Sequence, residues 1–250
     1  MLTSGKVRRR MRETKFSQCS MFRSSFVPLG LCLLFAPLAC TPTRETPGPT
    51  TAPAQPHRYD AQISQFEEQD RHNPPPKDAV LFLGSSSIRR WQDLADDFPD
   101  LQVINRGFGG SRIADSTHFL DRIVIPYRPR LIVFYAGEND IAGGMTPQHV
   151  FEDYKEFVTR VRRALPRTRI AFVSLKPSPS RAKHLEAFRQ ANELIRRYTT
   201  AHRRLSFIDV FTPMLGPDGQ PRPELFVADR LHLNRQGYDL WKTIIAEHLK

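Results

Sequence analysis

The stretch AVLFLGSSSIRRW, Ala79 to Trp91, joins the pattern of a buried strand to a cluster of polar residues. Its opening residues are continuously apolar, without the alternation of a half-exposed strand, which predicts a strand covered on both faces. The apolar run stops at Gly84, and Ser85, Ser86 and Ser87 follow before a helix-compatible segment, 88–98. A serine in a strand-to-helix turn exposes its hydroxyl near a helix N-terminus, which suits a nucleophile. The alternative is a set of helix caps, a position that serine often fills.

The same strand pattern recurs along the chain, and helical patterns lie between its occurrences. Further apolar runs lie at 101–105, 130–137, 169–175 and 205–210, and apolar residues recur at helical spacing within 150–165, 185–198 and 240–249. Buried strands separated by helices predict an α/β fold: a three-layer α/β/α sandwich with a doubly wound, flavodoxin-like parallel sheet of about five strands. Ligands of such sheets bind beyond the carboxyl ends of the strands.

The N-terminal region has the features of an export signal. Residues 24–39 follow Arg23 and form an apolar stretch that is too short and too proline-rich for a membrane span. Residues 1–40 are therefore expected to be a signal peptide, with Met21 as a candidate start. The sequence APLAC predicts a bacterial lipoprotein that is exported to the cell envelope and carries a lipid on Cys40. The alternative is an ordinary cleaved signal. The Thr/Pro-rich residues 41–56 predict a tether, and residues 57–250 the folded domain.

Charge and cysteine content exclude several classes of function. The net charge is +11, but seven basic residues and one acidic residue lie within the first 40 positions. The arginines between 160 and 204 fall on helix-like segments without interleaved aromatic residues, which indicates a solvated helix face and no nucleic-acid partner. No cysteine follows Cys40, so the folded domain has neither a disulfide nor a thiol nucleophile.

Three more polar blocks follow predicted strands or precede the last helix. NRGFGGS, 105–111, is glycine-rich but lacks the dinucleotide-binding spacing, so it is either a ligand-facing loop or a simple turn. GEND contains Asn139, a side-chain donor or a turn residue. Asp229 lies three residues before His232, a spacing that lets a carboxylate orient a general base; a surface ion pair or half of a metal site is the alternative. The other histidines are scattered, which argues against a metal.

Together these blocks resemble the SGNH hydrolase superfamily of GDSL-type esterases and lipases, over about residues 78–250. The branch that they resemble includes bacterial lipoproteins and the catalytic subunits of intracellular platelet-activating-factor acetylhydrolase. The resemblance implies a nucleophile at Ser86, an oxyanion hole of Ser86, Gly110 and Asn139, and an Asp229–His232 pair. Ser85 replaces the family's usual aspartate and Ile88 its usual threonine. Ser85 and Ser87 are expected to bond the backbone.

The implied reaction is hydrolysis of carboxylic esters without a metal or organic cofactor. Short acyl groups are expected to be preferred, because the longer irregular segments, 176–183 and 212–226, are rich in proline and polar residues and offer little apolar surface. A carbohydrate acetylesterase acting on cell-wall or plant glycans is one alternative. A non-catalytic glycan-binding lipoprotein is another, although a binding protein would not need Ser86, Asp229 and His232 together.

Overall fold

The computed structural model of the chain describes residues 56–249, which contain a single five-stranded sheet. All the strands are parallel and their order is β2-β1-β3-β4-β5. The strands are β1 (Val80–Gly84), β2 (Val103–Gly107), β3 (Leu131–Tyr135), β4 (Arg169–Val173) and β5 (Leu205–Ile208). This is the doubly wound flavodoxin-like order, and the predicted fold is confirmed.

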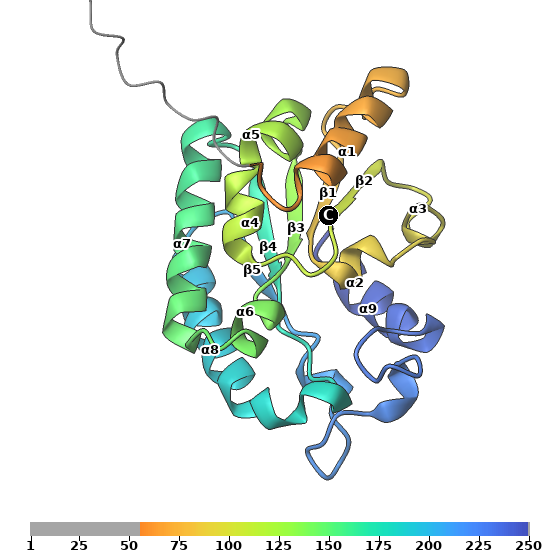
Figure 1. Ribbon diagram of the computed structural model, residues 1–250, viewed down its shortest axis with the longest axis vertical. Helices are drawn as coiled ribbons and strands as arrows, with labels where there is room; N and C mark the ends of the chain where they lie inside the picture. Colours follow the sequence, from red (N-terminus) through yellow and green to blue (C-terminus); the bar gives the residue numbers. More distant parts are fainter. Residues whose placement is uncertain (1–55, 250) are drawn as a thin grey trace, which may run out of the picture. The chain divides into compact units, whose positions relative to one another are not determined.

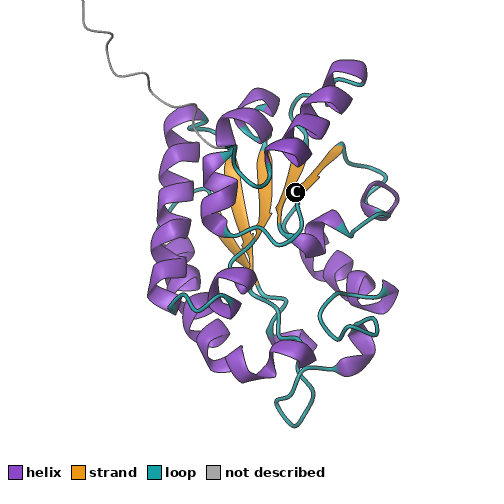
Figure 2. Cartoon of the chain, viewed as in Figure 1, coloured by secondary structure: helices purple, strands orange, loops and turns teal. Residues whose placement is uncertain are grey.

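Helices cover both faces of the sheet (Figures 1 and 2). Alternate strand residues point to opposite sides, so Leu81 and Leu83 belong to one core while Val80 and Phe82 belong to the other. The first core is covered by α1 (Asp60–His72), α4 (Ile113–His118), α5 (Leu120–Ile123), α7 (Pro147–Ala164) and α8 (Leu185–Ala201). The second is covered by α2 (Ser86–Arg89), α3 (Leu94–Asp97) and α9 (Arg235–Ala246). None of the helices in the described range is both long and apolar enough to cross a membrane.

The long helices form where the sequence supplies an apolar stripe and a cap. The Thr146 hydroxyl accepts a hydrogen bond from the amide of His149 at 3.2 Å, and Pro147 occupies the first turn of α7. The side chain of Asn234 likewise accepts from the amide of Gly237 and caps α9. The stripe that α7 buries is Val150, Tyr154, Phe157, Val158 and Val161.

The helix-compatible segment 88–98 lies in two short helices, and the chain between them buries a tryptophan. Helix α2 ends at Arg89, and α3 begins only at Leu94. Between them Trp91 is 1% exposed in the second core, and its indole nitrogen donates to Asp97 at 2.7 Å. In a continuous helix, the direction of the Trp91 side chain would be fixed by the helical repeat. The break between α2 and α3 removes this constraint, so that the indole can pack into the core.

Helix α1 was not anticipated from the sequence, since it has no apolar stripe. Ile63 is its one buried residue. Polar contacts attach the helix to α5 instead: the Arg122 guanidinium donates to Asp60 at 2.8 Å and to Glu67 at 2.6 and 2.7 Å. Such charge pairs leave no hydrophobic periodicity in the sequence.

The strand register brings three loops to one edge of the sheet. Gly84 at the end of β1 is level with Gly107 of β2 and with Tyr135 of β3. The segments that follow β1, β2 and β3 therefore leave the sheet side by side, at the point between β1 and β3 where the strand order reverses. Doubly wound folds bind their ligands at this switch point.

Candidate active site

The turn after β1 presents one serine of three. Gly84 has φ +143°, and a Cβ there would lie 1.9 Å from the carbonyl oxygen of Tyr135, so only glycine fits this turn. Helix α2 starts immediately afterwards, at Ser86. Ser85 and Ser87 are 4% and 1% exposed, whereas Ser86 is partly exposed. Ser86 is thus the serine that a substrate can reach.

The loop before α9 brings a histidine and an aspartate to that serine. The Nε2 atom of His232 lies 3.0 Å from the Ser86 hydroxyl oxygen, and its Nδ1 atom lies 2.6 Å from the Asp229 carboxylate. Ser86 and His232 are 146 positions apart in the sequence, so the fold alone brings them together. A hydroxyl, an imidazole and a carboxylate in this linear order form the arrangement that activates a serine.

Backbone amides hold the Asp229 carboxylate in place. Its other oxygen accepts from the amides of Leu231 and His232, each at 2.9 Å. Burial disfavours the charge on this carboxylate, but the amide and imidazole of His232 and the amide of Leu231 outweigh it and hold the pKa of Asp229 well below its usual range. The carboxylate therefore stays ionised at every pH where an imidazole titrates, and it fixes His232 with Nδ1–H directed to it.

The glycine block 105–111, which begins within β2, lies against the serine turn. The amide of Phe108 donates to the carbonyl of Gly84 at 2.8 Å. Asn105 joins the block to α2, because its side chain accepts from the Gly107 amide at 2.9 Å and donates to the carbonyl of Ile88 at 2.8 Å. Gly110 follows with φ +79°, and its amide has no hydrogen-bond acceptor within residues 56–249. That amide is free to donate to a ligand.

Asn139 lies in α6 (Glu138–Ala142), the one-turn helix that begins after β3. Its Nδ2 atom donates to the Ser85 hydroxyl at 2.9 Å and to the Ser111 carbonyl at 3.0 Å. The Ser86 amide also donates to the Ser85 hydroxyl, at 2.6 Å. Two of the three predicted oxyanion donors therefore converge on one oxygen atom, that of the Ser85 hydroxyl.

The two flanking serines differ in role. Ser85 bonds the backbone through the Ser86 amide, as predicted, and in addition holds Asn139. For Ser87 the prediction is wrong: its buried side chain bonds no backbone group, and it is its carbonyl that accepts a bond, from the Tyr238 hydroxyl at 2.9 Å. Ser87 is 1% exposed in the first turn of α2.

A buried charged network, which sequence reasoning missed, supports the Asn139 side of the site. Glu138 is 4% exposed and Lys176 1%, and their charged atoms are 2.6 Å apart. Glu138 also bonds the Tyr135 hydroxyl and lies 3.3 Å from Arg181. Burial opposes ionisation of Glu138, yet the charges of Lys176 and Arg181 prevail and lower its pKa. The sequence feature that could have indicated this network is the presence of charged residues just after β3 and just after β4, two strands that are adjacent in the sheet.

Residues 78–240 match the GDSL-like Lipase/Acylhydrolase family, a span that includes every predicted site residue except Cys40. The chain belongs to this family. It is an ester hydrolase of the GDSL type, and the predicted resemblance is confirmed.

Known relatives of this GDSL-type hydrolase agree with the assignment. Platelet-activating factor acetylhydrolase IB subunit alpha1 from Homo sapiens is 30% identical over 171 residues, 64% of this chain and 70% of the relative. The Bos taurus protein of the same name is 31% identical over 172 residues, 64% and 69% of the two chains.

Solved structures share the fold of this hydrolase. A Streptococcus pneumonia protein whose name refers to platelet activating factor superposes with a TM-score of 0.68 at 22% identity, over 76% of this chain and 92% of that one. A GDSL-like lipase from Bacteroides thetaiotaomicron gives a TM-score of 0.63 at 22% identity, over 75% and 97%.

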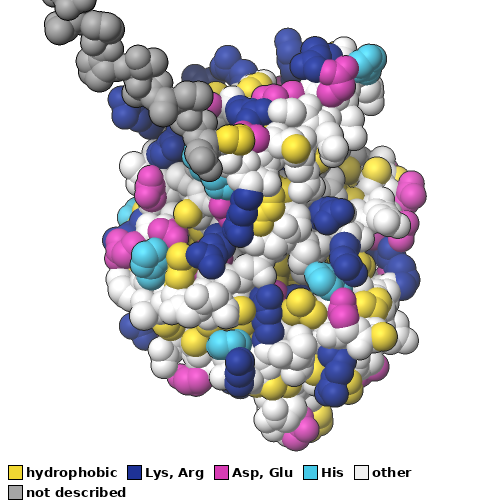
Figure 3. All heavy atoms as spheres, viewed as in Figure 1, with side chains coloured by type: hydrophobic (Ala, Val, Ile, Leu, Met, Phe, Trp, Pro, Cys, Tyr) yellow, Lys and Arg dark blue, Asp and Glu magenta, His cyan; other side chains and the backbone are white. Residues whose placement is uncertain are grey.

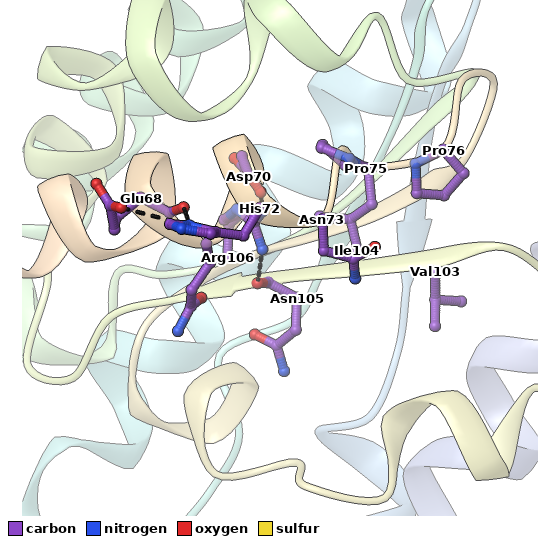
Figure 4. A pocket seen from close by; sticks show the side chains of 11 residues that line it. Glu68, Asp70, His72, Asn73, Pro75, Pro76, Val103, Ile104, Asn105 and Arg106 are labelled. Atoms are coloured by element: carbon purple, nitrogen blue, oxygen red, sulfur yellow. Dashed lines mark hydrogen bonds and ion pairs between the residues drawn. The ribbon is translucent and has the colours of Figure 1, made fainter.

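A separate pocket of about 660 Å³ lies between α1 and the edge strand β2 of this hydrolase (Figure 4). None of the predicted site residues lines it. Its charged residues are committed to other contacts, since Arg106 pairs with Asp70 and also donates to the Tyr127 hydroxyl at 2.8 Å. Within residues 56–249 no group of three or more His, Cys, Asp or Glu side chains is placed to hold a metal ion.

Proposed function

We propose that the protein is a serine esterase in which Ser86 is the nucleophile, His232 the general base and Asp229 its orienting carboxylate. The observation that carries this proposal is the 3.0 Å separation between the Ser86 hydroxyl and Nε2 of His232, with Asp229 at 2.6 Å on the other side of the ring. A general base must be within hydrogen-bonding distance of the proton that it removes. Partial exposure of Ser86 gives an ester access to the same hydroxyl.

The reaction follows from these positions. His232 takes the hydroxyl proton as Ser86 Oγ bonds to the ester carbonyl carbon, and the carbonyl oxygen becomes an oxyanion. Protonated His232 returns the proton to the departing alcohol when the carbon–oxygen bond breaks. Water then loses a proton to His232 as it attacks the acyl-enzyme, and this proton returns to Ser86 as the carboxylic acid leaves. Asp229 stays ionised throughout and stabilises the imidazolium.

Three donors are proposed to hold the oxyanion: the amides of Ser86 and Gly110 and Nδ2 of Asn139. The Gly110 amide has no competing acceptor within the described residues. In the free protein the other two donors share the Ser85 hydroxyl as their acceptor. An oxyanion beside Ser86 carries a full charge and is the stronger acceptor, so it draws these bonds from a neutral hydroxyl. The donors are thus oriented before the reaction begins.

Short acyl groups, acetyl to butyryl, are proposed to be hydrolysed best. Among the described residues, Val227 is the one large hydrophobic residue that is well exposed, at 38%. On the face seen in Figure 3 the hydrophobic side chains form small, separate areas between basic and other polar ones. A long acyl chain gains about 0.8 kcal/mol for each methylene group only where there is apolar surface to bury it. The acetylhydrolase name of the mammalian relatives supports the same choice.

We therefore expect kcat/KM for p-nitrophenyl acetate and butyrate to exceed that for the palmitate by at least about tenfold. The three esters are compared in matched detergent dispersion, so that micelle formation affects all of them equally. A palmitate value above that of acetate would rule out the short-acyl assignment and indicate an apolar groove.

Activity is expected to fall in acid, because His232 must be neutral to accept the Ser86 proton. A protonated imidazole has no nitrogen free to accept this proton, so kcat/KM decreases as the pH falls. The pKa of Asp229 is held well below its usual range, so this carboxylate remains ionised across the same interval and does not cause the decrease. Circular dichroism at each pH checks that the chain stays folded. A rate that remains flat far into acid would remove histidine as the base.

The physiological setting is part of the proposal. We propose that residues 1–40 direct export, that Cys40 carries the lipid anchor and that residues 41–56 hold the hydrolase away from the membrane of a bacterial envelope. Residues 1–55 lie outside the described range. The supporting feature is the apolar segment ending in APLAC, followed by a Thr/Pro-rich stretch. Export would also give access to acetylated glycans, the second candidate substrate class.

A panel of esters tests the activity and separates the substrate classes. Purified protein is assayed with p-nitrophenyl acetate, acetylated xylan and acetylated peptidoglycan. Faster release of acetate from one glycan than from the aryl ester would identify a carbohydrate acetylesterase. Hydrolysis of none of these substrates by the folded protein would contradict the proposed function and favour a binding role.

A further inference from the structure

The orientation of the Asn139 side chain decides whether it can stabilise an oxyanion. The two ends of an asparagine amide have nearly the same shape, but Nδ2 donates hydrogen bonds and Oδ1 accepts them. A half-turn of this group would direct a carbonyl oxygen at the oxyanion and repel it. Acceptors at Ser85 and Ser111 favour the productive orientation from the Nδ2 end. The Ser85 hydroxyl does not enforce it, because a hydroxyl can also donate.

Arg181 enforces the orientation from the other end. Its NH2 atom donates to Oδ1 of Asn139 at 2.8 Å. A guanidinium has donors and no acceptor, so the atom that it faces must be the carbonyl oxygen. Arg181 lies in the 3-10 segment Pro179–His184 after β4, and its side chain is only 18% exposed. Two groups around Asn139 cannot accommodate the reversed amide: the Ser111 carbonyl, which has no hydrogen to donate, and the Arg181 guanidinium, which has no acceptor.

The guanidinium is itself fixed by the buried network. Its NH1 atom lies 3.3 Å from Glu138, whose carboxylate is held by Lys176 at 2.6 Å. Since Lys176 already neutralises Glu138, charge balance does not require a second cation there. The same segment also contacts the loop that carries the histidine, because the Ser180 amide donates to the carbonyl of Arg230 at 3.0 Å. The segment Pro179–His184 thus contacts both halves of the site, through Arg181 on the Asn139 side and through Ser180 on the His232 side.

We propose that Arg181 is a positioning residue that fixes the Asn139 amide with its Nδ2 atom toward the oxyanion, an inference that rests on the proposed esterase function. Arg181 acts through Asn139 and needs no contact with substrate. The effect of Arg181 on kcat is therefore part of the effect of Asn139 on kcat. It disappears when the Asn139 side chain is removed. This dependence separates a positioning role from a structural one.

A double-mutant cycle measures this dependence. Arg181→Met, Asn139→Ala and the double variant are compared with the wild type in kcat and KM for p-nitrophenyl acetate, and in the rate of reaction with a fluorophosphonate, which needs no natural substrate. We expect Arg181→Met to lower kcat by about 10-fold to 100-fold with little change in KM, a smaller loss than the roughly 10²–10³-fold effect of removing the oxyanion donor itself. In the Asn139→Ala background the same substitution should change kcat by less than about twofold. Equal losses in both backgrounds, or no loss in either, would overturn the proposal.

Two further variants control the cycle. Arg181→Lys keeps a donor near Oδ1 and should recover part of the kcat lost in Arg181→Met. Arg197→Met removes an arginine from the exposed face of α8, where it pairs with Glu193, and should leave kcat unchanged. The melting temperature of each variant separates loss of fold from loss of orientation. A kcat of Arg181→Lys no higher than that of Arg181→Met, with both variants folded, would count against the proposal.

An activity-independent measurement keeps the inference separate from the esterase proposal. In ¹⁵N-labelled protein the Asn139 side-chain resonances are assigned by their loss in Asn139→Ala. With Nδ2 held by Ser85 and Ser111, its two protons should be well dispersed and exchange slowly with solvent. In Arg181→Met they should shift and exchange faster, even if no ester is hydrolysed. Unchanged resonances in Arg181→Met would overturn the positioning role whether or not the protein is an esterase.

Discussion

Replacement of Ser86 by alanine is expected to lower kcat for p-nitrophenyl acetate by at least about 10⁴-fold, as the loss of a serine nucleophile does in other hydrolases. The reason is local and chemical: His232 Nε2 lies 3.0 Å from this hydroxyl, and without it the ester meets no group that can form an acyl-enzyme. Stability should change little, because Ser86 is partly exposed and its amide, which donates to Ser85, remains.

A neighbouring serine provides the matched control for this variant. Ser87→Ala removes the same kind of hydroxyl one position further along, from a residue that is only 1% exposed. It should retain kcat within about threefold of the wild type. If Ser86→Ala kept more than a few per cent of the activity, or if Ser87→Ala lost as much, the assignment of the nucleophile would be wrong.

Replacement of Asn139 by alanine is expected to lower kcat by roughly 10²–10³-fold, the usual effect of losing one oxyanion donor. The KM should change much less, because the ground-state carbonyl carries little of the charge that Nδ2 stabilises. The variant loses bonds to Ser85, Ser111 and Arg181, so its melting temperature is measured alongside. A folded variant with near-wild-type kcat would show that the amides of Ser86 and Gly110 suffice and that Asn139 is a turn residue.

Much of the fold could be predicted because parallel strands buried on both faces leave an unmistakable pattern. Runs such as Leu131–Tyr135 are apolar at every position and buried at every position, since each face meets a different helical layer. The helices α7, α8 and α9 carry apolar stripes for the same reason. Helix α1 left no such pattern, because ion pairs to Arg122 hold much of it in place. The break between α2 and α3 depends on where Trp91 packs, which is a property of the tertiary structure.

The candidate active-site residues could be recognised from local sequence, but the residues that hold them in position could not. Ser86, Asn139 and His232 each lie in a short block with its own signal, and the strand ends bring these blocks together. Arg181 and Lys176 lie in a segment that reads as a polar, proline-rich connection. Their roles depend on β3 and β4 being neighbours, which places charged side chains beside Glu138. Contacts between residues that follow different strands can be predicted only when the order of the strands in the sheet is known.

The most direct test of the central claim is to identify the residue that a fluorophosphonate modifies. Trypsin releases the peptide 78–89, which contains Ser85, Ser86 and Ser87, and fragment ions locate the adduct within it. We expect a single adduct on Ser86, absent from Ser86→Ala and formed far more slowly in His232→Ala. An adduct on Ser85 or Ser87, or no adduct on the folded wild-type protein, would contradict it.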